Sequence, residues 1–246
     1  MIRIGHNINT NMLPLFYFLP KKHPLYELFV AEPAGHNKML EQGQIDMAPV
    51  SSFAYAQHWQ EYAILPNLSV TNYGWVGSIL LFSKVPLEEL DHKTVALTNQ
   101  SATSINLLKI ILFHYLGIEA AFLTMPPDLS EMMARADAAL LIGDSAIKAN
   151  ATNHGYLVFD LGHEWRRLTG YPMTFSVWAY TRRLIEECPA ELLAVYQILL
   201  RAKQQALENF SCIIEASKQL VGLDDAFWQD YFSRFNYDLS PLAIEG

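Results

Sequence analysis

Hydroxyl and amide side chains gather where the sequence predicts that a strand ends and a helix begins. The clearest case lies in residues 94–112, where a short β-rich run passes through a polar turn into a helix marked by Ile105 and Leu108. Ser101, Thr103 and Ser104 stand at the start of that helix. Such side chains cap free backbone N–H groups, and the remaining N–H groups attract a carboxylate or phosphate. We therefore expect these three residues to bind substrate, with helix capping alone as the alternative.

Three further junctions carry the same chemistry. Asn11 follows a first strand at residues 2–4, and Pro14 suits the first turn of the next helix. Ser51 and Ser52 follow a strand at residues 45–50, and Ser78 lies near the start of a strand at residues 74–83. Because four polar junctions are more than capping requires, we expect Asn11, Ser51, Ser52 and Ser78 to face a ligand.

Two single residues complete the candidate set. Asp144 follows an apolar strand at residues 137–142 and either caps the next helix or binds a substrate hydroxyl. His6 stands just past the first strand, where it either touches ligand or stabilises a turn. The eight histidines show no spacing typical of a metal site, so no metal is predicted. Glycine-rich nucleotide motifs and the hydrolase GxSxG motif are absent as well.

The charge and composition of the sequence exclude some classes of binding partner. The 246 residues carry a net charge of −8, which argues against nucleic acid and anionic membranes as partners, because both need a basic surface. A small anionic substrate is still compatible, because backbone dipoles can hold it locally. Neither a signal peptide nor an apolar run of about 18 residues is recognisable, which predicts a soluble cytoplasmic protein. Cys188 and Cys212 are expected to serve helix packing.

Alternating strands and helices predict an α/β fold. A change of character after about residue 182, from alternation to three helices at 187–209, 211–220 and 224–235, suggests that the chain returns to its first lobe. We therefore expect one lobe of residues 1–83 plus 180–246 and a second of residues 84–179. In such folds ligands bind in a cleft at the carboxyl ends of the strands, between the lobes.

Several segments together resemble a known family, the chorismate dehydratases of the futalosine route to menaquinone. The resemblance follows the chain in order from residue 1 to about Leu239. Its segments are residues 9–15 (NTNMLPL), 43–52 (GQIDMAPVSS), 77–86 (GSILLFSKVP), 95–104 (VALTNQSATS), 138–144 (AALLIGD) and 159–172, which contains FDLG, Trp165 and TGYP. Residues 7–10 depart from the family pattern by placing additional polar groups beside Asn11.

The resemblance implies a two-lobed fold like that of type II periplasmic binding proteins, each lobe a mixed, mostly parallel sheet flanked by helices. It implies a hydro-lyase that removes water from chorismate to give 3-[(1-carboxyvinyl)oxy]benzoate, with no cofactor and no metal. Asn11 corresponds to the family's catalytic asparagine and Ser78 to a ligand-contacting serine. Ser101, Thr103 and Ser104 correspond to the helix start that holds a carboxylate. The oligomeric state is expected to be monomer or homodimer.

Two other readings stay open from the sequence. The same fold suits a non-catalytic protein that binds a small anion. A related enzyme of the same pathway makes 1,4-dihydroxy-6-naphthoate and is expected to use a histidine as base. The segment around residues 13–15 resembles the dehydratase more closely.

Overall fold

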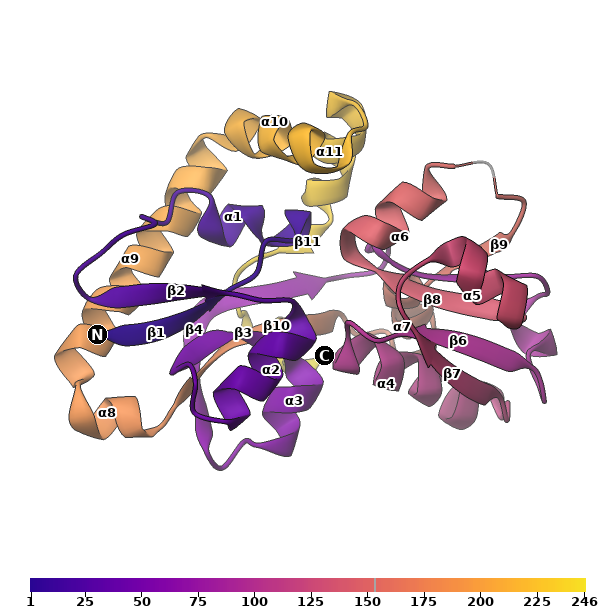
Figure 1. Cartoon of the computed structure of the whole chain (residues 1–246), viewed down its shortest axis with the longest axis horizontal. Coiled ribbons are helices and arrows are strands. Elements are labelled where there is room, and N and C mark those ends of the chain that lie inside the picture. Colours follow the sequence, from indigo (N-terminus) through magenta and orange to yellow (C-terminus); the bar gives the residue numbers. More distant parts are fainter. Residues whose placement is uncertain (153) are drawn as a thin grey trace. The chain divides into compact units, whose positions relative to one another are not determined.

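The computed structural model describes residues 1–152 and 154–246 and divides into two compact units. Unit 1 comprises Met1–Thr71 and Thr174–Ile244, and unit 2 comprises Asn72–Met173 and Glu245–Gly246. Our sequence-based lobe boundaries at 83/84 and 179/180 stay a prediction. Each unit is built on a sheet of its own (Figure 1).

Unit 1 contains a six-stranded mixed sheet in the order β11-β4-β10-β3-β1-β2. β1 runs parallel to β2 and β3, and β10 is antiparallel to β3. Its strands are β1 (Ile2–His6), β2 (Tyr26–Val30), β3 (Met47–Ser51), β4 (Tyr62–Asn72), β10 (Met173–Thr181) and β11 (Phe235–Asn236).

Helices cover both faces of this sheet. One face packs on α1 and α9 in a core that includes Ile4, Met47 and Trp178, and the other packs on α2 and α3 around Ala48 and Val50 (Figure 1). The helices are η1 (Thr10–Met12), α1 (Leu13–Phe16), α2 (Pro33–Glu41), α3 (Ser52–Gln57), α8 (Arg183–Glu187), α9 (Pro189–Glu208), α10 (Phe210–Val221), α11 (Asp225–Ser233) and α12 (Pro241–Glu245).

Unit 2 contains a five-stranded sheet in the order β7-β6-β8-β5-β9. β6 is parallel to β7 and β8, whereas β5 runs antiparallel to β8 and β9. Its strands are β5 (Ile79–Ser83), β6 (Thr94–Thr98), β7 (Ala121–Met125), β8 (Ala138–Ile142) and β9 (Leu157–Asp160). The mixed, helix-flanked sheets of both units agree with the fold class predicted from the sequence.

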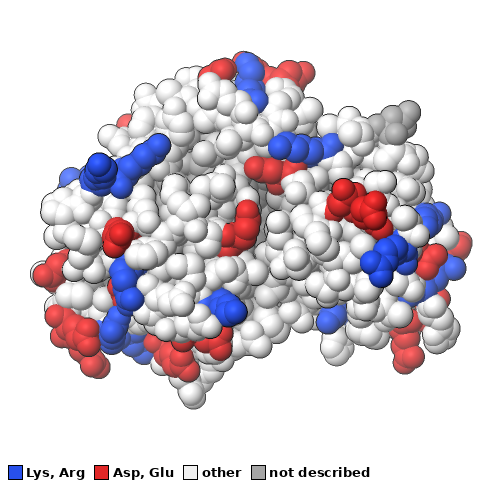
Figure 2. Space-filling view, viewed as in Figure 1, with Lys and Arg blue, Asp and Glu red and all other residues white. Residues whose placement is uncertain are grey.

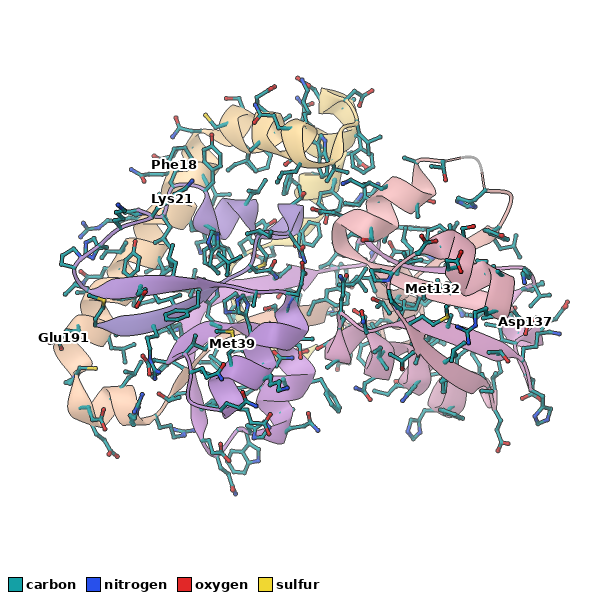
Figure 3. The ribbon with its side chains drawn as sticks, in the orientation of Figure 1. Phe18, Lys21, Met39, Met132, Asp137 and Glu191 are labelled. Carbon is teal, nitrogen blue, oxygen red and sulfur yellow. The ribbon has the colours of Figure 1, made fainter. Side chains whose placement is uncertain are left out.

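The core of unit 2 lies between its sheet and helices. Met132 and Met133 of α5 and Ala146 of α6 pack on Phe82 and Leu141 of the sheet; Met132 is labelled in Figure 3. The helices of this unit are η2 (Leu87–Glu89), α4 (Ala102–Ile110), the π-helix η3 (Ile111–Leu116), α5 (Leu129–Arg135), α6 (Gly143–Asn150) and α7 (Leu161–Thr169).

The structure corrects several sequence-based elements. Residues 62–66 and 68–70 read as two short strands in the sequence, whereas the structure joins them in one strand, β4. Asn67 within it adopts a φ of 56°, and its carbonyl accepts a hydrogen bond from Lys203. Residues 30–33 read as a short strand in the sequence, but the strand lies earlier, as β2, since Pro33 begins α2. The segment after residue 182 is not purely helical, because β11 adds an edge strand to the sheet of unit 1.

On the face drawn in Figure 2, Lys and Arg side chains are interspersed with acidic ones and form no continuous basic surface. Within residues 1–152 and 154–246, no helix is both long and apolar enough to cross a membrane.

Candidate functional site

In unit 1 the predicted residues lie at the carboxyl edge of the sheet. β1 and β3 are parallel, with Ile4 opposite Met47, so that His6 and Ser51 end neighbouring strands at one edge. The chain after His6 turns directly into η1, which carries Asn11. The sheet therefore brings three of the predicted residues to the same end of unit 1, as parallel topology requires.

The backbone around Asn11 is held by a short series of hydrogen bonds. The Oδ1 atom of Asn7 accepts from the N–H of Asn9 at 2.9 Å, and the N–H of Met12 donates to the Asn9 carbonyl at 2.9 Å. The carbonyl of Asn11 accepts from the hydroxyl of Tyr237 at 2.9 Å. Asn11 is half-buried, and its side-chain amide makes no hydrogen bond to another described residue. That amide is available to a ligand.

His6 is positioned by aromatic packing. Its ring lies 4.6 Å from the ring of Phe16 in α1, and Phe16 in turn packs on Trp178 at 5.3 Å. Burial lowers the pKa of His6, and the nearby charge of Lys21, labelled in Figure 3, lowers it further. The imidazole is therefore neutral at pH 7, where it can donate or accept one hydrogen bond but carries no charge to attract an anion.

The Ser51 hydroxyl caps helix α3. Its hydroxyl accepts from the N–H of Ala54 at 3.1 Å as the cap of α3, and it lies 3.3 Å from the amide nitrogen of Asn37, a donor. Ser52 is the half-buried first residue of the same helix. The capping alternative thus accounts for Ser51, and the proposed ligand contacts of both serines stay predictions.

In unit 2 the predicted residues also share one edge of a sheet. Ile79 of β5 lies opposite Ile142 of β8, which places Ser78 beside the turn that contains Asp144. β6 runs parallel to β8, so that the turn after Thr98, with Ser101, ends at the same edge. The sheet therefore brings Ser78, Asp144 and the start of α4 to one edge of unit 2.

Ser78 is buried and stands on a tightly turned backbone. Only 2% of its surface is exposed, and its carbonyl accepts from the N–H of Gly143 at 2.7 Å. Gly77 and Gly143 adopt φ values of 74° and 59°, a region that side chains other than glycine rarely enter. The two glycines let the chain turn on either side of this contact.

At the start of α4, Ser101 acts as the helix cap. Its hydroxyl accepts from the N–H of Ser104 at 3.1 Å and donates to the hydroxyl of Ser104 at 2.9 Å. Thr103 and Ser104 are buried, whereas Ser101 is half-buried. Asp144 is half-buried in the first turn of α6, whose cap position is Ile142. Capping therefore accounts for Ser101, while ligand contacts by all four residues stay predictions.

Asp160 is a residue of this edge that our sequence reasoning did not select. It is 1% exposed and ends β9. Its carboxylate accepts from the N–H groups of Gly162 and His163 at the start of α7, and from those of Val76 and Gly77 directly before Ser78, at 2.6–3.1 Å. Burial raises the pKa of Asp160, and these four donors oppose that rise.

The Asp160 carboxylate and the four N–H groups that it binds, together called the Asp160 clamp, also explain why position 162 is glycine. A Cβ atom on Gly162 would lie 2.4 Å from the carbonyl oxygen of Gly74, so that only glycine allows the start of α7 to meet residues 74–77 this closely. An acidic residue between an apolar strand and a helix is a recognisable capping signal. The bonds from Val76 and Gly77 to Asp160 join positions 84 and 83 residues apart, so they leave no local pattern in the sequence.

Among residues 1–152 and 154–246, no group of three or more His, Cys, Asp or Glu side chains could hold a metal ion. Of the predicted site residues, Asp144 in unit 2 is the acidic one, and His6 in unit 1 is a neutral imidazole. The other predicted residues of each unit offer amide, hydroxyl and backbone N–H groups.

Solved structures with this fold include several binding proteins. A protein of Archaeoglobus fulgidus superposes with a TM-score of 0.77 at 21% identity, covering 99% of this chain and 92% of its own. The alkanesulfonate-binding protein SsuA of Xanthomonas axonopodis pv. citri, bound to MOPS, gives a TM-score of 0.69 at 16% identity, covering 99% and 88%. These likenesses confirm the type II periplasmic-binding-protein fold predicted from the sequence.

Comparison of the sequence with those of known proteins identifies the family of the chain. The chorismate dehydratase of Thermus thermophilus is 34% identical over 94% of this chain and 86% of its own length. The family model described as menaquinone biosynthesis matches residues 2–246. On both grounds, the chain belongs to the menaquinone biosynthesis family.

Proposed function

We propose that this protein is a chorismate dehydratase, a hydro-lyase that converts chorismate into 3-[(1-carboxyvinyl)oxy]benzoate and water. The observation that carries the proposal is the 34% identity to the Thermus thermophilus chorismate dehydratase across nearly the whole chain. The amide and hydroxyl character of the candidate residues supports it, because the reaction makes an aromatic ring and so has a strong driving force of its own.

The chemistry requires one C–H bond and one C–O bond of the substrate to break. The ring carbon that bears the ether oxygen loses its proton, and the electron pair spreads through the ring double bond toward the ring carboxylate. The neighbouring carbon then releases its hydroxyl group, which leaves with the proton as water. The reaction involves no net oxidation or reduction of the substrate. The protein therefore has to orient the substrate and to stabilise the negative charge that grows on its ring carboxylate.

Asn11 is the proposed catalytic residue. Its side-chain amide is half-buried and has no hydrogen-bond partner among the described residues, so its N–H groups can donate to a carboxylate on which negative charge grows. For the proton acceptor we propose a carboxylate of the substrate itself. His6 is neutral and packs on Phe16, and we propose that it contacts substrate without taking the proton.

The remaining candidate residues are proposed to bind substrate without taking part in bond breaking. We propose that the hydroxyls of Ser101, Thr103 and Ser104, with the first N–H groups of α4, bind a substrate carboxylate. A helix start offers N–H donors and the positive end of the helix dipole to such a group. Ser51, Ser52, Ser78 and Asp144 are proposed as further substrate contacts.

Cellular location and assembly complete the proposal. We propose that the protein acts in the cytoplasm, as expected of a biosynthetic enzyme, and that it is a monomer or homodimer. Light scattering on the purified protein across a range of concentrations distinguishes these two states.

The deciding experiment incubates the purified protein with chorismate, with neither metal nor cofactor added, and follows both chorismate and the enolpyruvyl-benzoate by chromatography. We expect chorismate to be consumed and the benzoate to accumulate in equal amounts. Binding of chorismate without turnover would instead identify a binding protein, and the absence of binding would favour the naphthoate-forming reaction.

The role of Asn11 is tested by two variants in the same assay. Asn11→Ala removes the amide and is expected to lower kcat by roughly 10²–10³-fold, the usual cost of losing one donor to a developing negative charge. Asn11→Asp keeps the shape but replaces the donor by an anion, and it should be at least as damaging. Full turnover by either variant would remove Asn11 from the scheme.

A further inference from the structure

The carbonyl of Asn11 lacks a donor from its own helical turn. The N–H of Met12 donates to the Asn9 carbonyl, and the N–H of Leu13 donates to that of Thr10. The next bond in this three-residue series would run from position 14 to the carbonyl of Asn11. Position 14 is proline, which has no N–H to give.

A side chain from the other end of the sequence supplies the donor. The hydroxyl of Tyr237 donates to the Asn11 carbonyl at 2.9 Å, across 226 positions of the chain. The Tyr237 side chain is only 6% exposed and belongs to the same core cluster as Met12 and Leu15. Burial raises the pKa of Tyr237 well above its usual value, so the hydroxyl keeps its proton throughout the accessible pH range.

The segment that carries Tyr237 is itself anchored, by two hydrogen bonds from Ser69 and by an ion pair at Asp238. The N–H of Ser69 donates to the carbonyl of Tyr237 at 3.0 Å, and the hydroxyl of Ser69 donates to the carbonyl of Asp238 at 3.0 Å. Lys203, which is buried, forms an ion pair with the Asp238 carboxylate. Because the backbone of Tyr237 is fixed by these contacts, its hydroxyl can hold the Asn11 carbonyl in a defined position.

We propose that Tyr237 is a positioning residue for catalysis, which acts through the Asn11 carbonyl to orient the Asn11 side-chain amide. This inference rests on the proposed role of Asn11 in chorismate dehydration. The amide side chain and the anchored carbonyl belong to one residue, so a change in the direction of that peptide also turns the side chain. Errors of about 1 Å in such a group are enough to slow a reaction severely.

Unit 1 offers a matched control for the variant that removes this hydroxyl. Tyr26 is 2% exposed, and its hydroxyl donates to the carbonyl of Pro20 at 2.6 Å, another bond from a buried phenol to a backbone carbonyl near a proline. Tyr26 begins β2, opposite Ile2, and therefore lies at the end of the sheet away from His6. Tyr237→Phe and Tyr26→Phe remove the same atom and the same kind of bond.

The experiment measures kcat, KM and the melting temperature for both variants. Each loses one buried hydrogen bond, so we expect both melting temperatures to fall by a similar few degrees, about 2–5 °C. Tyr237→Phe should in addition lower kcat roughly tenfold with little change in KM, since orientation in the transition state is what it disturbs. Tyr26→Phe should leave kcat unchanged. Equal effects of the two variants on kcat would overturn the proposal.

A double-variant cycle ties the effect to Asn11. In an Asn11→Ala background the side chain to be positioned is missing, and Tyr237→Phe should no longer change kcat. A tenfold loss that persists in this background would show that Tyr237 acts by another route. Should Tyr237→Phe fail to fold, Ser69→Ala serves in its place, because it loosens the segment and should give a smaller loss of kcat that again vanishes with Asn11→Ala.

A readout without turnover separates this inference from the proposed function. Asn11 side-chain amide signals can be assigned in ¹⁵N spectra by their absence in Asn11→Ala. Tyr237→Phe is expected to shift them, whereas Tyr26→Phe is not, and unshifted signals would contradict the positioning role. If wild-type protein does not dehydrate chorismate, the proposed function fails, while these spectra still decide whether Tyr237 positions Asn11.

Discussion

Two stretches of backbone carry the residues that matter most for the proposed reaction, and they are held in opposite ways. In unit 1 the Asn11 carbonyl is held by one neutral donor, the hydroxyl of Tyr237. In unit 2 the N–H groups of Val76 and Gly77, directly before Ser78, are held by a buried acceptor, the carboxylate of Asp160. The Tyr237 contact is a single hydrogen bond, whereas the Asp160 contact is a negative charge that accepts from four N–H groups.

The difference follows from what each side chain must satisfy. A phenol hydroxyl has one proton to donate, so a single carbonyl is enough for it when buried. A buried carboxylate needs several donors, since burial of an unpaired charge is far more costly than burial of a neutral polar group. The Asp160 clamp is therefore expected to dominate stability, and the unit 1 contact is expected to matter chiefly for alignment.

The largest expected effect comes from Asp160→Asn. The new amide keeps one oxygen acceptor but turns its NH₂ group toward N–H donors, which then lose their partner. We expect the free energy of unfolding of unit 2 to fall by about 3 kcal/mol. Hydrogen exchange at the amides of Val76 and Gly77 should accelerate accordingly, because these are the groups released.

The matched control for this variant is Asp128→Asn. Asp128 is an exposed cap that accepts from the N–H of Glu131 at 3.0 Å, and asparagine caps helices about as well as aspartate. The free energy of unfolding of the Asp128→Asn variant should differ from that of the wild type by only a few tenths of a kcal/mol. Similar losses for the two variants would show that Asp160 is an ordinary cap and that the comparison between the units is mistaken.

A second test asks whether unit 1 also contains a costly buried group. His36 is 0% exposed, its Nε2 atom donates to the carbonyl of Phe29 at 3.2 Å, and its Nδ1 atom has no partner among the described residues. It is packed on Gly5, where an added Cβ atom would lie 2.8 Å from its ring. Burial lowers the pKa of His36 to about 4 from a usual value of 6.5.

Because the folded value is the lower one, the unfolded chain binds a proton first as the pH falls. The contribution of neutral His36 is complete above pH 6.5 and is lost progressively down to about pH 4. At pH 5 the loss amounts to about 2 kcal/mol. We expect His36→Gln, which can keep the donor to Phe29, to lose less stability than wild type between pH 7 and pH 5 in urea titrations. Identical pH dependence would contradict the buried neutral state.

The smallest expected effect concerns Ser101. Replacing this cap by alanine should lower stability by about 1 kcal/mol, as should Asp128→Ala in the same unit. If Ser101 also binds a substrate carboxylate, as proposed, its variant alone should raise the KM for chorismate. An unchanged KM would leave Ser101 with capping only and would favour Thr103 and Ser104 as the groups that bind substrate.

Local patterns in the sequence were sufficient for much of the fold. Ser101 and its helix, the apolar strand before Gly143 and the proline at the start of α1 all follow from short-range rules. β7 escaped prediction because Ala121–Met125 shows no clear alternation at the edge of its sheet. β4 reads as two short strands in the sequence because Pro66 and Asn67 resemble a turn. In the structure one strand runs through both residues, and the Asn67 carbonyl accepts a hydrogen bond from Lys203 of α9.

The same limit applies to the candidate site. Hydroxyl and amide residues at strand ends could be selected because parallel strands carry their carboxyl ends to one edge. Tyr237 and Asp160 could not be given their roles, since Tyr237 acts on backbone 226 positions away and Asp160 acts on backbone 84 and 83 positions away. A tyrosine near the end of a helical segment has no feature that sets it apart from one that merely packs.

The place of β10 in unit 1 has a consequence for protein synthesis. This strand lies between β4 and β3, near the middle of the sheet, yet it follows all of unit 2 except its last two residues in the chain. As the nascent chain leaves the ribosome, unit 2 can begin to fold as a continuous stretch, while β1 to β4 wait without their central partner. The alignment of Asn11 comes later still, because Tyr237 follows β10 in the chain.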